Sequence, residues 1–151
     1  MAIEFCFITA TDPLIAQAYA VRLAVFVLEQ AVPLDMEIDE HEPAADHLVA
    51  LNDGKGIGTL RLLYHDGGTV AKIGRVAVVV PYRGQHLGQE LMLRAIDHIH
   101  EHGGCTAITL DAQTHAVSFY ERLGFSVHGE PFLDAGIPHI TMTMPLVSAA
   151  R

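Results

Sequence analysis

The chain has 151 residues, of which 50% are apolar and 18% are charged. This length suits one compact domain over residues 1–151, and low charge combined with high apolar content argues against intrinsic disorder. The net charge of -9 with neutral histidines disfavours a nucleic-acid binder, because duplex affinity needs basic groups that neutralise phosphates.

Charge is unevenly distributed along the sequence. Residues 23–54 contain no Lys or Arg but eight carboxylates, whereas residues 55–94 carry six basic side chains against two acidic ones. One interpretation is that the middle of the chain binds an anionic partner and the acidic stretch a cationic one. The other is uneven surface decoration with no ligand involved.

Cysteine usage and the N-terminal residues indicate the cellular compartment of the protein. Cys6 and Cys105 form neither a metal-binding spacing nor a disulfide framework, so a reducing compartment is expected. No basic residue precedes Arg22, unlike the start of a signal peptide. No apolar run reaches the ~18 residues that a membrane span needs. These features predict a cytoplasmic protein without a membrane segment.

The first third of the chain predicts a strand, a helix and a loop. Residues 3–8 alternate as a half-buried strand does. Asp12 and Pro13 are typical of a helix start, and the helical period that follows ends before Pro33. The acidic residues 33–43 lack a long apolar period and predict an ordered loop with a turn of helix.

Three strand-like runs come next and predict an antiparallel meander. Asp-Gly and Asp-Gly-Gly turns separate them, and they span residues 47–51, 57–64 and 69–80. The segment 76–80 is apolar at every position, which predicts a strand buried on both faces that stops at Pro81.

The second half predicts alternating helices and strands. Apolar spacing marks helices over residues 86–102 and 114–123, and strands over 106–111, 125–130 and 138–146. Gly103 and Gly124 supply the two helix ends. A strand-helix-strand unit joined to an antiparallel meander indicates a mixed-sheet α/β domain.

A glycine-containing turn links the apolar strand to the helix that follows it. The turn reads Arg83-Gly84-Gln85-His86-Leu87-Gly88. Unpaired backbone N–H groups at the positive end of a helix dipole bind phosphate or pyrophosphate groups, and Arg83 adds a positive charge. The Lys-Ser/Thr of a nucleoside triphosphate-binding loop is absent.

A second feature lies about 30 residues downstream. Residues 116–125 read as a short amphipathic helix, a glycine and a return strand, in the order Ala-x-x-Phe-Tyr-x-x-x-Gly-Phe. Together with the glycine-containing turn, this spacing resembles the acyl-CoA-dependent N-acyltransferases of the GNAT superfamily over essentially the whole chain. Segments 22–33, 37–39 and 73–78 are similar to the ElaA-like branch.

The resemblance implies a fold and a co-substrate. The fold would be a central, mostly antiparallel sheet with splayed strands flanked by helices, and the co-substrate acetyl-CoA, with no metal. The family also implies a homodimer. The implied CoA contacts are Val76, Ala77, Val78, Arg83, Gly84, Gln85, His86, Leu87, Gly88, Gln113 and Phe119. Two of them depart from the family pattern, since His86 replaces a glycine and Gln113 a frequent Asn. Histidine tolerates a positive φ, so the turn can survive.

The family mechanism requires a carbonyl-polarising group, a base and an acid. Backbone N–H groups near Val76–Val78 would polarise the thioester. Tyr120 matches the usual general acid, which protonates the departing thiolate. The base is not marked, because residues 72–80 contain no carboxylate; the candidates are Glu29, Glu37, Asp39, His47 and His139. We favour His47, since a histidine of pKa ~6.5 suits a base near neutrality and Asp46 adjoins it.

Two opposite interpretations of the acceptor remain open. Glu29 and Glu37 would contact a cationic, polyamine-like amine, whereas Arg61 and Arg75 would bind the anionic group of an amino sugar phosphate. A metal site at His98, His100 and His102 is not favoured, because no third ligand accompanies the pair that shares a helix face.

The sequence thus predicts an N-acetyltransferase that acts on a primary amine of a small molecule. The amine would attack acetyl-CoA directly in a ternary complex. The alternative is a CoA-binding regulatory module that has kept the cofactor groove and lost turnover.

Overall fold

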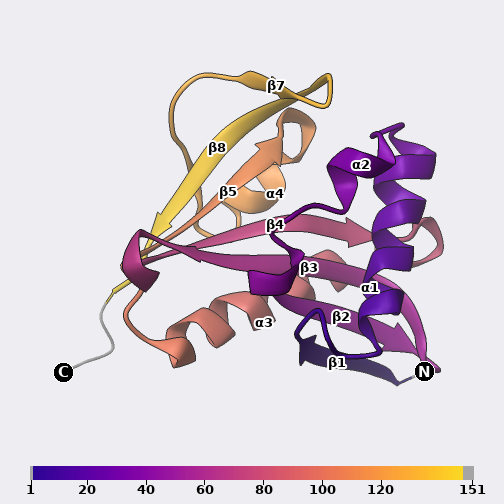
Figure 1. Ribbon diagram of the computed structural model, residues 1–151. Coiled ribbons are helices and arrows are strands. Elements are labelled where there is room, and N and C mark those ends of the chain that lie inside the picture. The colour runs from indigo at the N-terminus through magenta and orange to yellow at the C-terminus, as the bar shows by residue number, and fades with distance from the viewer. Residues whose placement is uncertain (1, 148–151) are drawn as a thin grey trace.

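The computed structural model describes residues 2–147 and contains one mixed sheet in that range, with helices on both faces (Figure 1). The strands are β1 Ile3–Ile8, β2 Asp46–Asn52, β3 Lys55–His65, β4 Val70–Val78, β5 Ala107–Gln113, β6 Ser126–Val127, β7 Phe132–Asp134 and β8 Ile137–Pro145. They are ordered β1-β2-β3-β4-β5-β8-β6, with β7 paired to β8. Within the described residues, β4 and β5 are the one parallel pair. The predicted mixed sheet is confirmed.

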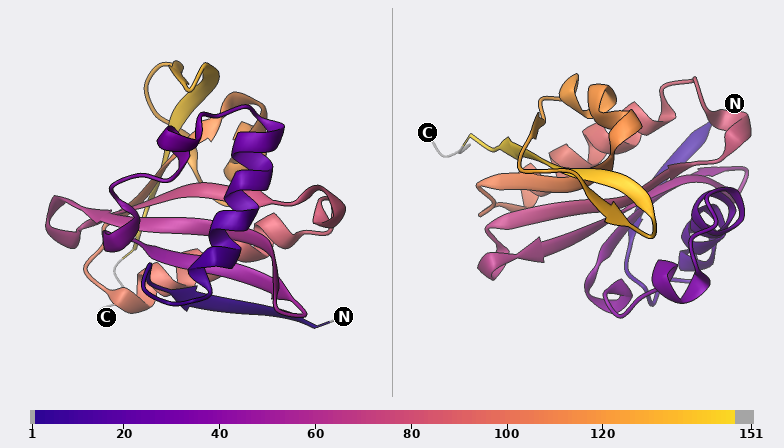
Figure 2. Two further views of the ribbon diagram at one scale, coloured as in Figure 1. Left: turned by 45° about the vertical axis from the view of Figure 1, so that its right-hand side comes forward. Right: turned by 90° about the horizontal axis from the view of Figure 1, so that it is seen from above.

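The helices form two layers on opposite faces of the sheet (Figure 2). One layer holds α1 Ile15–Arg22, a π-helical continuation Leu23–Glu29 and α2 Leu34–Glu37; the other holds α3 Leu87–His102 and α4 Val117–Glu121. The main core lies between the sheet and α3, where Leu62, Leu91 and Ile108 are fully buried. No helix within residues 2–147 is long and apolar enough to cross a membrane.

The first helix changes its winding before it reaches the centre of the molecule. Asp12 accepts a hydrogen bond from the backbone N–H of Leu14 at 2.9 Å, as expected for the predicted helix start. From Leu23 the winding is π-helical, and the N–H of Gln30 bonds to the carbonyl of Val25 at 3.1 Å. Wider turns of this kind occur mostly at functional sites.

Strand β4 leaves its neighbour β5 partway along its length. The two strands pair only from Val70 to Ile73, opposite Ala107–Leu110. Just beyond that point, Thr59 and Arg61 of β3 stand opposite Ala77 and Gly74, so β4 carries an extra residue. A bulge of this kind bends and twists a strand, which explains why β4 diverges from β5.

The bulge places Arg75 in the left-handed region, at φ 55°. This conformation is rare for a residue with a Cβ and persists where the surrounding structure enforces it. The Arg75 side chain donates to the backbone carbonyls of Met36 and Glu37 and pairs with the carboxylates of Glu37 and Asp39, which hold it in place.

The predicted burial of segment 76–80 is wrong. The strand ends at Val78, and Val80 lies in a short turn with 62% of its surface exposed. Only Ala77 of this segment is buried. Ala77 and Val78 still pair with β3, but on the β5 side the apolar run borders an open gap, so no second strand covers that edge.

The later elements differ in extent from their predictions. The predicted helix 114–123 consists of a 3-10 turn over Thr114–Ala116 followed by α4. The strand predicted at 125–130 has only two residues, and the sequence patterns missed β7. Helix α3 begins one residue later than predicted, after His86.

Candidate active site

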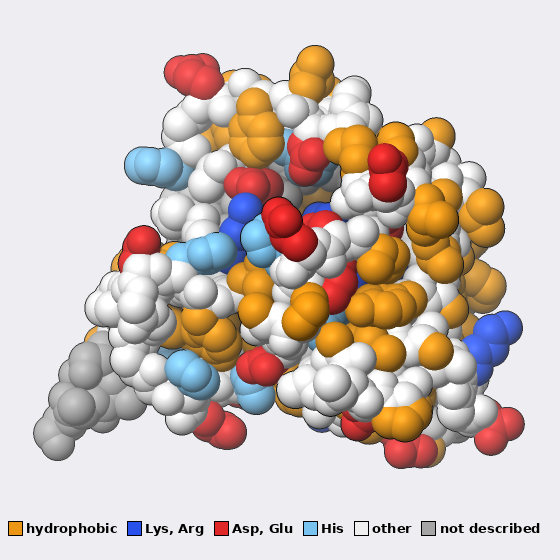
Figure 3. Space-filling model, viewed as in Figure 1, with side chains coloured by type: hydrophobic (Ala, Val, Ile, Leu, Met, Phe, Trp, Pro, Cys, Tyr) orange, Lys and Arg blue, Asp and Glu red, His pale blue; other side chains and the backbone are white. Residues whose placement is uncertain are grey.

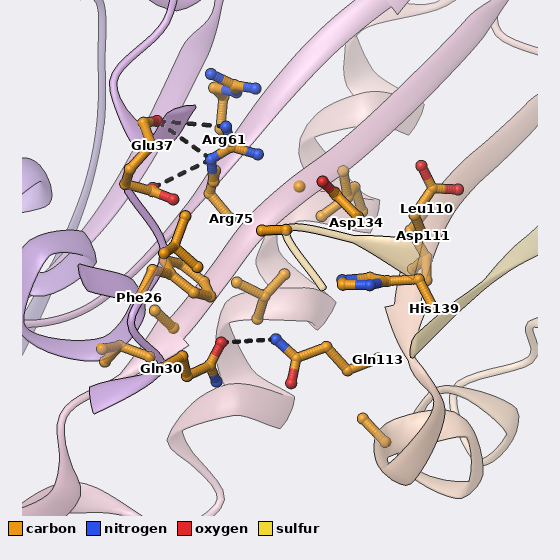
Figure 4. A pocket seen from close by; sticks show the side chains of 18 of the residues that line it. Phe26, Gln30, Glu37, Arg61, Arg75, Leu110, Asp111, Gln113, Asp134 and His139 are labelled. Carbon is orange, nitrogen blue, oxygen red and sulfur yellow. Dashed lines mark hydrogen bonds and ion pairs between the residues drawn. The ribbon is translucent and has the colours of Figure 1, made fainter. Parts of the chain in front are cut away.

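A cleft of about 640 Å³ occupies the gap between the diverging strands β4 and β5 (Figure 4). Side chains of the π-helical segment, α2, α4 and the β7–β8 hairpin also line it. Acidic, basic and histidine side chains gather on this side of the molecule, below the hairpin (Figure 3). The cleft therefore combines apolar walls with a dense group of ionisable residues, as ligand sites do.

The two faces of the sheet contribute different chemistry to the cleft. Leu110 and Ala112 of β5 are buried on the α3 and α4 side. Asp111 and Gln113 alternate with them and point to the opposite face, where His139 stands across from Gln113 in the β5–β8 register. The gap is therefore lined from both faces of the sheet.

The implied CoA contacts divide into two groups. Val76, Ala77, Val78, Arg83 and Gln113 line the cleft. Gln85, His86 and Leu87 line a separate hollow of about 400 Å³ against β1, and Phe119 lies beside Gly88. The His86 side chain thus faces β1 rather than the cleft.

The turn between β4 and α3 has the geometry of an anion-binding loop. His86 adopts φ 63° and Gly84 φ 76°, so histidine keeps the left-handed turn that the family forms with glycine. The N-terminal N–H groups of α3 follow directly. An unpaired edge of β4 next to such a loop fits an acyl-CoA, whose thioester arm needs backbone partners and whose pyrophosphate needs N–H donors.

The expected phosphate ligand Arg83 already has partners in the protein. Its guanidinium forms a two-point ion pair with Glu29 at 2.7 and 2.6 Å, and its Nε donates to the carbonyl of Val78 at 2.8 Å. The hydrogen bond from Arg83 lowers the pKa of the Glu29 carboxyl. Glu29, predicted to contact a cationic amine, is therefore neutralised by a neighbour.

A bridge of amides spans the two walls of the cleft. Gln113 Nε2 of β5 donates to Gln30 Oε1 at the end of the π-helical segment, at 2.8 Å (Figure 4). His115 Nε2 lies 2.8 Å from Gln113 Oε1. Gln113, an implied CoA contact, is thus held in place from both sides.

Tyr120 of α4 reaches the cleft from the face that carries α3. The side chain is buried, with Phe119 and Phe125 packed edge-on against its ring. Burial raises the pKa of the phenol to about 12, so it keeps its proton at neutral pH. A protonated phenol suits the predicted role of general acid, which stays a prediction.

A buried ion network lies behind the α2 wall of the cleft. Arg22 is 1% exposed and donates to Glu37 at 2.8 Å and to Glu42 at 2.7 Å. Burial raises the pKa of Glu37, an effect that Arg22 and Arg75 oppose. Burial also acts on Glu42, but hydrogen bonds from Arg22 and the Asp39 N–H outweigh it and lower the pKa to about 2.

The other two arginines join the same network from β3 and β4. Arg61 pairs with Asp39 at 2.8 Å and Glu42 at 3.0 Å. Arg75 pairs with Glu37 and Asp39, both at 3.1 Å. Three arginines and three carboxylates therefore neutralise one another.

The uneven charge along the sequence thus reflects pairing inside the protein. The acidic stretch supplies Glu37, Asp39 and Glu42, and their partners lie on either side of it in the sequence. Such pairing accounts for these three of the eight carboxylates in residues 23–54, and the binding of charged partners stays a prediction.

His47, the favoured base, lies outside the cleft. It is 1% exposed, its Nε2 is 3.3 Å from the carbonyl of Glu42, and Tyr19 packs edge-on against its ring. Burial lowers its pKa. The prediction is wrong on position, because strand alternation turns His47 beneath the ion network. Among the other candidates, Glu29, Glu37 and His139 line the cleft, whereas Asp39 does not.

The sequence analysis missed three ionisable side chains that line the cleft. Lys72 and Asp111 form an ion pair at 3.1 Å on the cleft wall. Asp134 lines the cleft from β7, and within residues 2–147 its carboxylate has no ion-pair or hydrogen-bond partner. The turn signal Asp-Ala-Gly at 134–136, directly before a predicted strand, marks this hairpin.

Two of the three histidines of α3 pack against aromatic rings. His98 stacks on Phe7 at 3.9 Å and His102 on Tyr64 at 4.2 Å. In the described part of the chain, no three metal-ligating side chains come together.

Comparison with known proteins places these features in context. A family model for the acetyltransferase (GNAT) domain matches residues 14–146. The uncharacterized N-acetyltransferase YjcF of Bacillus subtilis is 38% identical over 136 residues, which cover 89% of this chain and 95% of that protein. The protein ElaA of Escherichia coli is 33% identical over 141 residues, 89% of this chain and 92% of ElaA. The crystal structure of an acyl-CoA N-acyltransferase from Pseudomonas aeruginosa matches with a TM-score of 0.84 and 33% identity, covering 95% of this chain and 99% of that one.

Proposed function

Because this chain belongs to the GNAT acetyltransferase family, in its ElaA-like branch, we propose that it acetylates a primary amine of a small molecule that carries a second positive charge. As a member of that family it is an acyl-CoA-dependent N-acetyltransferase. The observation that carries the acceptor class is Asp134, the cleft carboxylate left without a partner in the described residues. The acetyl group itself and the acceptor are the proposed parts.

Acetyl-CoA is proposed to lie along the open edge of β4. Backbone N–H groups near Val76–Val78 would polarise its thioester carbonyl, and the turn before α3 would hold its pyrophosphate. Tyr120 would protonate the departing thiolate from the α4 side.

Direct attack by the amine is favoured by the composition of the cleft. The described lining residues include no Cys or Ser that would carry an acyl group. Side chains from both faces of the sheet border the same gap, so the two substrates can meet there. Holding both substrates in one cleft makes the reaction effectively unimolecular, because the entropy cost of bringing them together is met when they bind.

The charge balance of the cleft favours a polyamine-like acceptor over an amino sugar phosphate. The Lys and Arg side chains that line the cleft are all ion-paired; Lys72, for example, pairs with Asp111 at 3.1 Å. A phosphate on the acceptor would have to compete with these carboxylates for the cationic side chains. A second ammonium group would instead find Asp134 free of competing cations.

An acceptor screen tests the proposal. Thiol release from acetyl-CoA is measured with diamines and polyamines, with monoamines of equal length, and with amino sugar phosphates. We expect diamines to react best, and Asp134→Asn to lower kcat/KM for them up to about fivefold, because Asp134 is exposed and exposed ion pairs contribute about 0.2–1 kcal/mol. The matched control is Asp35→Asn, an exposed carboxylate outside the cleft lining.

Two outcomes would overturn the proposal. Preference for amino sugar phosphates, or an Asp134→Asn variant equal to wild type on diamines, contradicts the acceptor class. Thermal stabilisation by acetyl-CoA without turnover on any amine would support the regulatory module instead. The homodimer and the cytoplasmic location stay predictions.

A further inference from the structure

We propose that His139 is the base that takes the proton from the acceptor ammonium. The proposal rests on the acetyl transfer proposed above and supplies the group that the sequence did not mark. His139 lies on β8, lines the cleft and is half-buried, with its ring directed into the cavity (Figure 4).

The ring of His139 is held in one tautomer. Its Nδ1 lies 2.7 Å from the carbonyl oxygen of Ile137. A carbonyl only accepts hydrogen bonds, so Nδ1 carries the hydrogen and Nε2 keeps its lone pair. Phe132 of β7 stacks on the same ring at 6.0 Å, which fixes the ring plane. Nε2 is therefore preset to receive a proton.

His139 lies on the opposite side of the sheet from the proposed acid. It stands across from Gln113 on the face that carries Asp111, whereas Tyr120 enters from the α4 layer. The reacting carbon would lie in the gap between them. A base on the amine side and an acid on the thiol side is the arrangement that direct attack needs.

The two other candidates in the cleft are less available, and the first of them, Glu29, accepts two hydrogen bonds from Arg83 at 2.7 and 2.6 Å. Glu37 Oε2 accepts from Arg22 at 2.8 Å and from Arg75 at 3.1 Å, and its side chain is only 3% exposed. The ionisable groups that share the cleft with His139 include the carboxylates Glu29, Glu37, Asp111 and Asp134, the basic side chains Arg61, Lys72, Arg75 and Arg83, and the histidines His41, His65 and His115. The Lys and Arg side chains, Glu29, Glu37 and Asp111 all belong to ion pairs, whereas Asp134 has no ion-pair partner within residues 2–147.

The proposed acetyl transfer balances in protons and electrons. The ammonium gives one proton to His139 Nε2, which later releases it to solvent. The neutral nitrogen attacks the thioester carbon, a C–N bond forms, and the C–S bond breaks with its electron pair on sulfur. Sulfur takes a proton from Tyr120, and the second proton lost by nitrogen restores the phenol. One proton is released for each amide formed.

The test is the pH dependence of kcat/KM in wild type and His139→Gln. The variant is expected to lose about a hundredfold at pH 7, together with the ionisation on the acidic limb. Its rate should recover above pH 9, where the acceptor deprotonates without help. Its affinity for acetyl-CoA should stay within twofold, which a merely misfolded variant would not show. His128→Gln, an exposed histidine outside the cleft lining, is the matched control.

His139→Asn serves as a second variant if the Gln form does not fold. Turnover by wild type tests the acetyl transfer separately from the base. With active wild type, retention of the acidic ionisation in either His139 variant overturns the proposal. The proposal is also overturned if Glu37→Gln loses the acidic ionisation while His139→Gln retains it, because the base would then be Glu37.

Discussion

Replacing Glu29 with Gln is expected to tighten the binding of CoA. In the structure both terminal nitrogens of Arg83 bond to Glu29, at 2.7 and 2.6 Å, and its Nε bonds to the carbonyl of Val78. A pyrophosphate that binds the guanidinium would compete with this carboxylate for the positive charge and for two of its five N–H donors. Glutamine keeps the length of the side chain and removes its charge, so it competes less.

The size of the effect follows from the exposure of the pair. Both side chains are 39% exposed, and exposed ion pairs contribute about 0.2–1 kcal/mol. Two-point geometry places this pair near the upper end. Removing the competitor should therefore lower the Kd of CoA up to about fivefold at low salt. At high salt the difference should shrink, because exposed charges are screened.

Titration calorimetry of CoA into wild type, Glu29→Gln, Arg83→Gln and the double variant measures this competition. Arg83→Gln alone should weaken binding, and the Glu29 substitution should have no effect in that background. The reasoning is refuted if Glu29→Gln leaves the Kd unchanged or raises it. Equal tightening in the Arg83→Gln background would refute it as well, since the gain would not pass through Arg83.

Three further outcomes are expected. Tyr120→Phe should lower kcat about a hundredfold in steady-state assays while the acetyl-CoA Kd changes less than twofold. Burial raises the pKa of Tyr120 from 10 to about 12, so the native protein loses stability as pH rises through that range. Alkaline melting curves should show a smaller loss in the Phe variant. The pKa of Glu42 is lowered from 4.5 to about 2, so its contribution to the stability of the native protein is present above pH 4.5 and is lost as pH falls toward 2. Glu42→Gln should therefore lower the melting temperature at pH 7 and make that temperature depend less on acid pH. Gly56→Ala should lower the free energy of unfolding in urea by more than about 2 kcal/mol, because the new Cβ would lie 2.6 Å from the carbonyl oxygen of Gln17. Gly74→Ala should lower it little, because its Cβ meets nothing within 4 Å.

Local patterns predicted most of the sheet. The Asp-Gly turns at 53–54 and 66–67 separate β2, β3 and β4 as expected, because tight turns depend on neighbouring residues alone. The turn before α3 was also foreseen, including a left-handed His86 at φ 63°. β7 was missed because three exposed residues carry no clear alternation.

The features that depend on tertiary contacts could not be predicted. The run at 76–80 has the composition of a buried strand, yet the bulge at Arg75 turns it to the edge of a cleft. His47 has the residue type and the neighbour that a base needs, but strand register buries it. The pairing of Arg22 with Glu37 joins residues 15 apart in the sequence, and no local pattern specifies it.

Pairing between β4 and β5 stops after Ile73 and Leu110, four residue pairs into the ladder. The gap beyond this point is bordered by both faces of the sheet, so the thioester and the amine need not share a path. Steady-state kinetics should then show intersecting lines and random addition of substrates rather than a ping-pong pattern. CoA as product should compete with acetyl-CoA and not with the amine. We therefore expect the divergence of β4 from β5 to allow the two substrates to bind in either order.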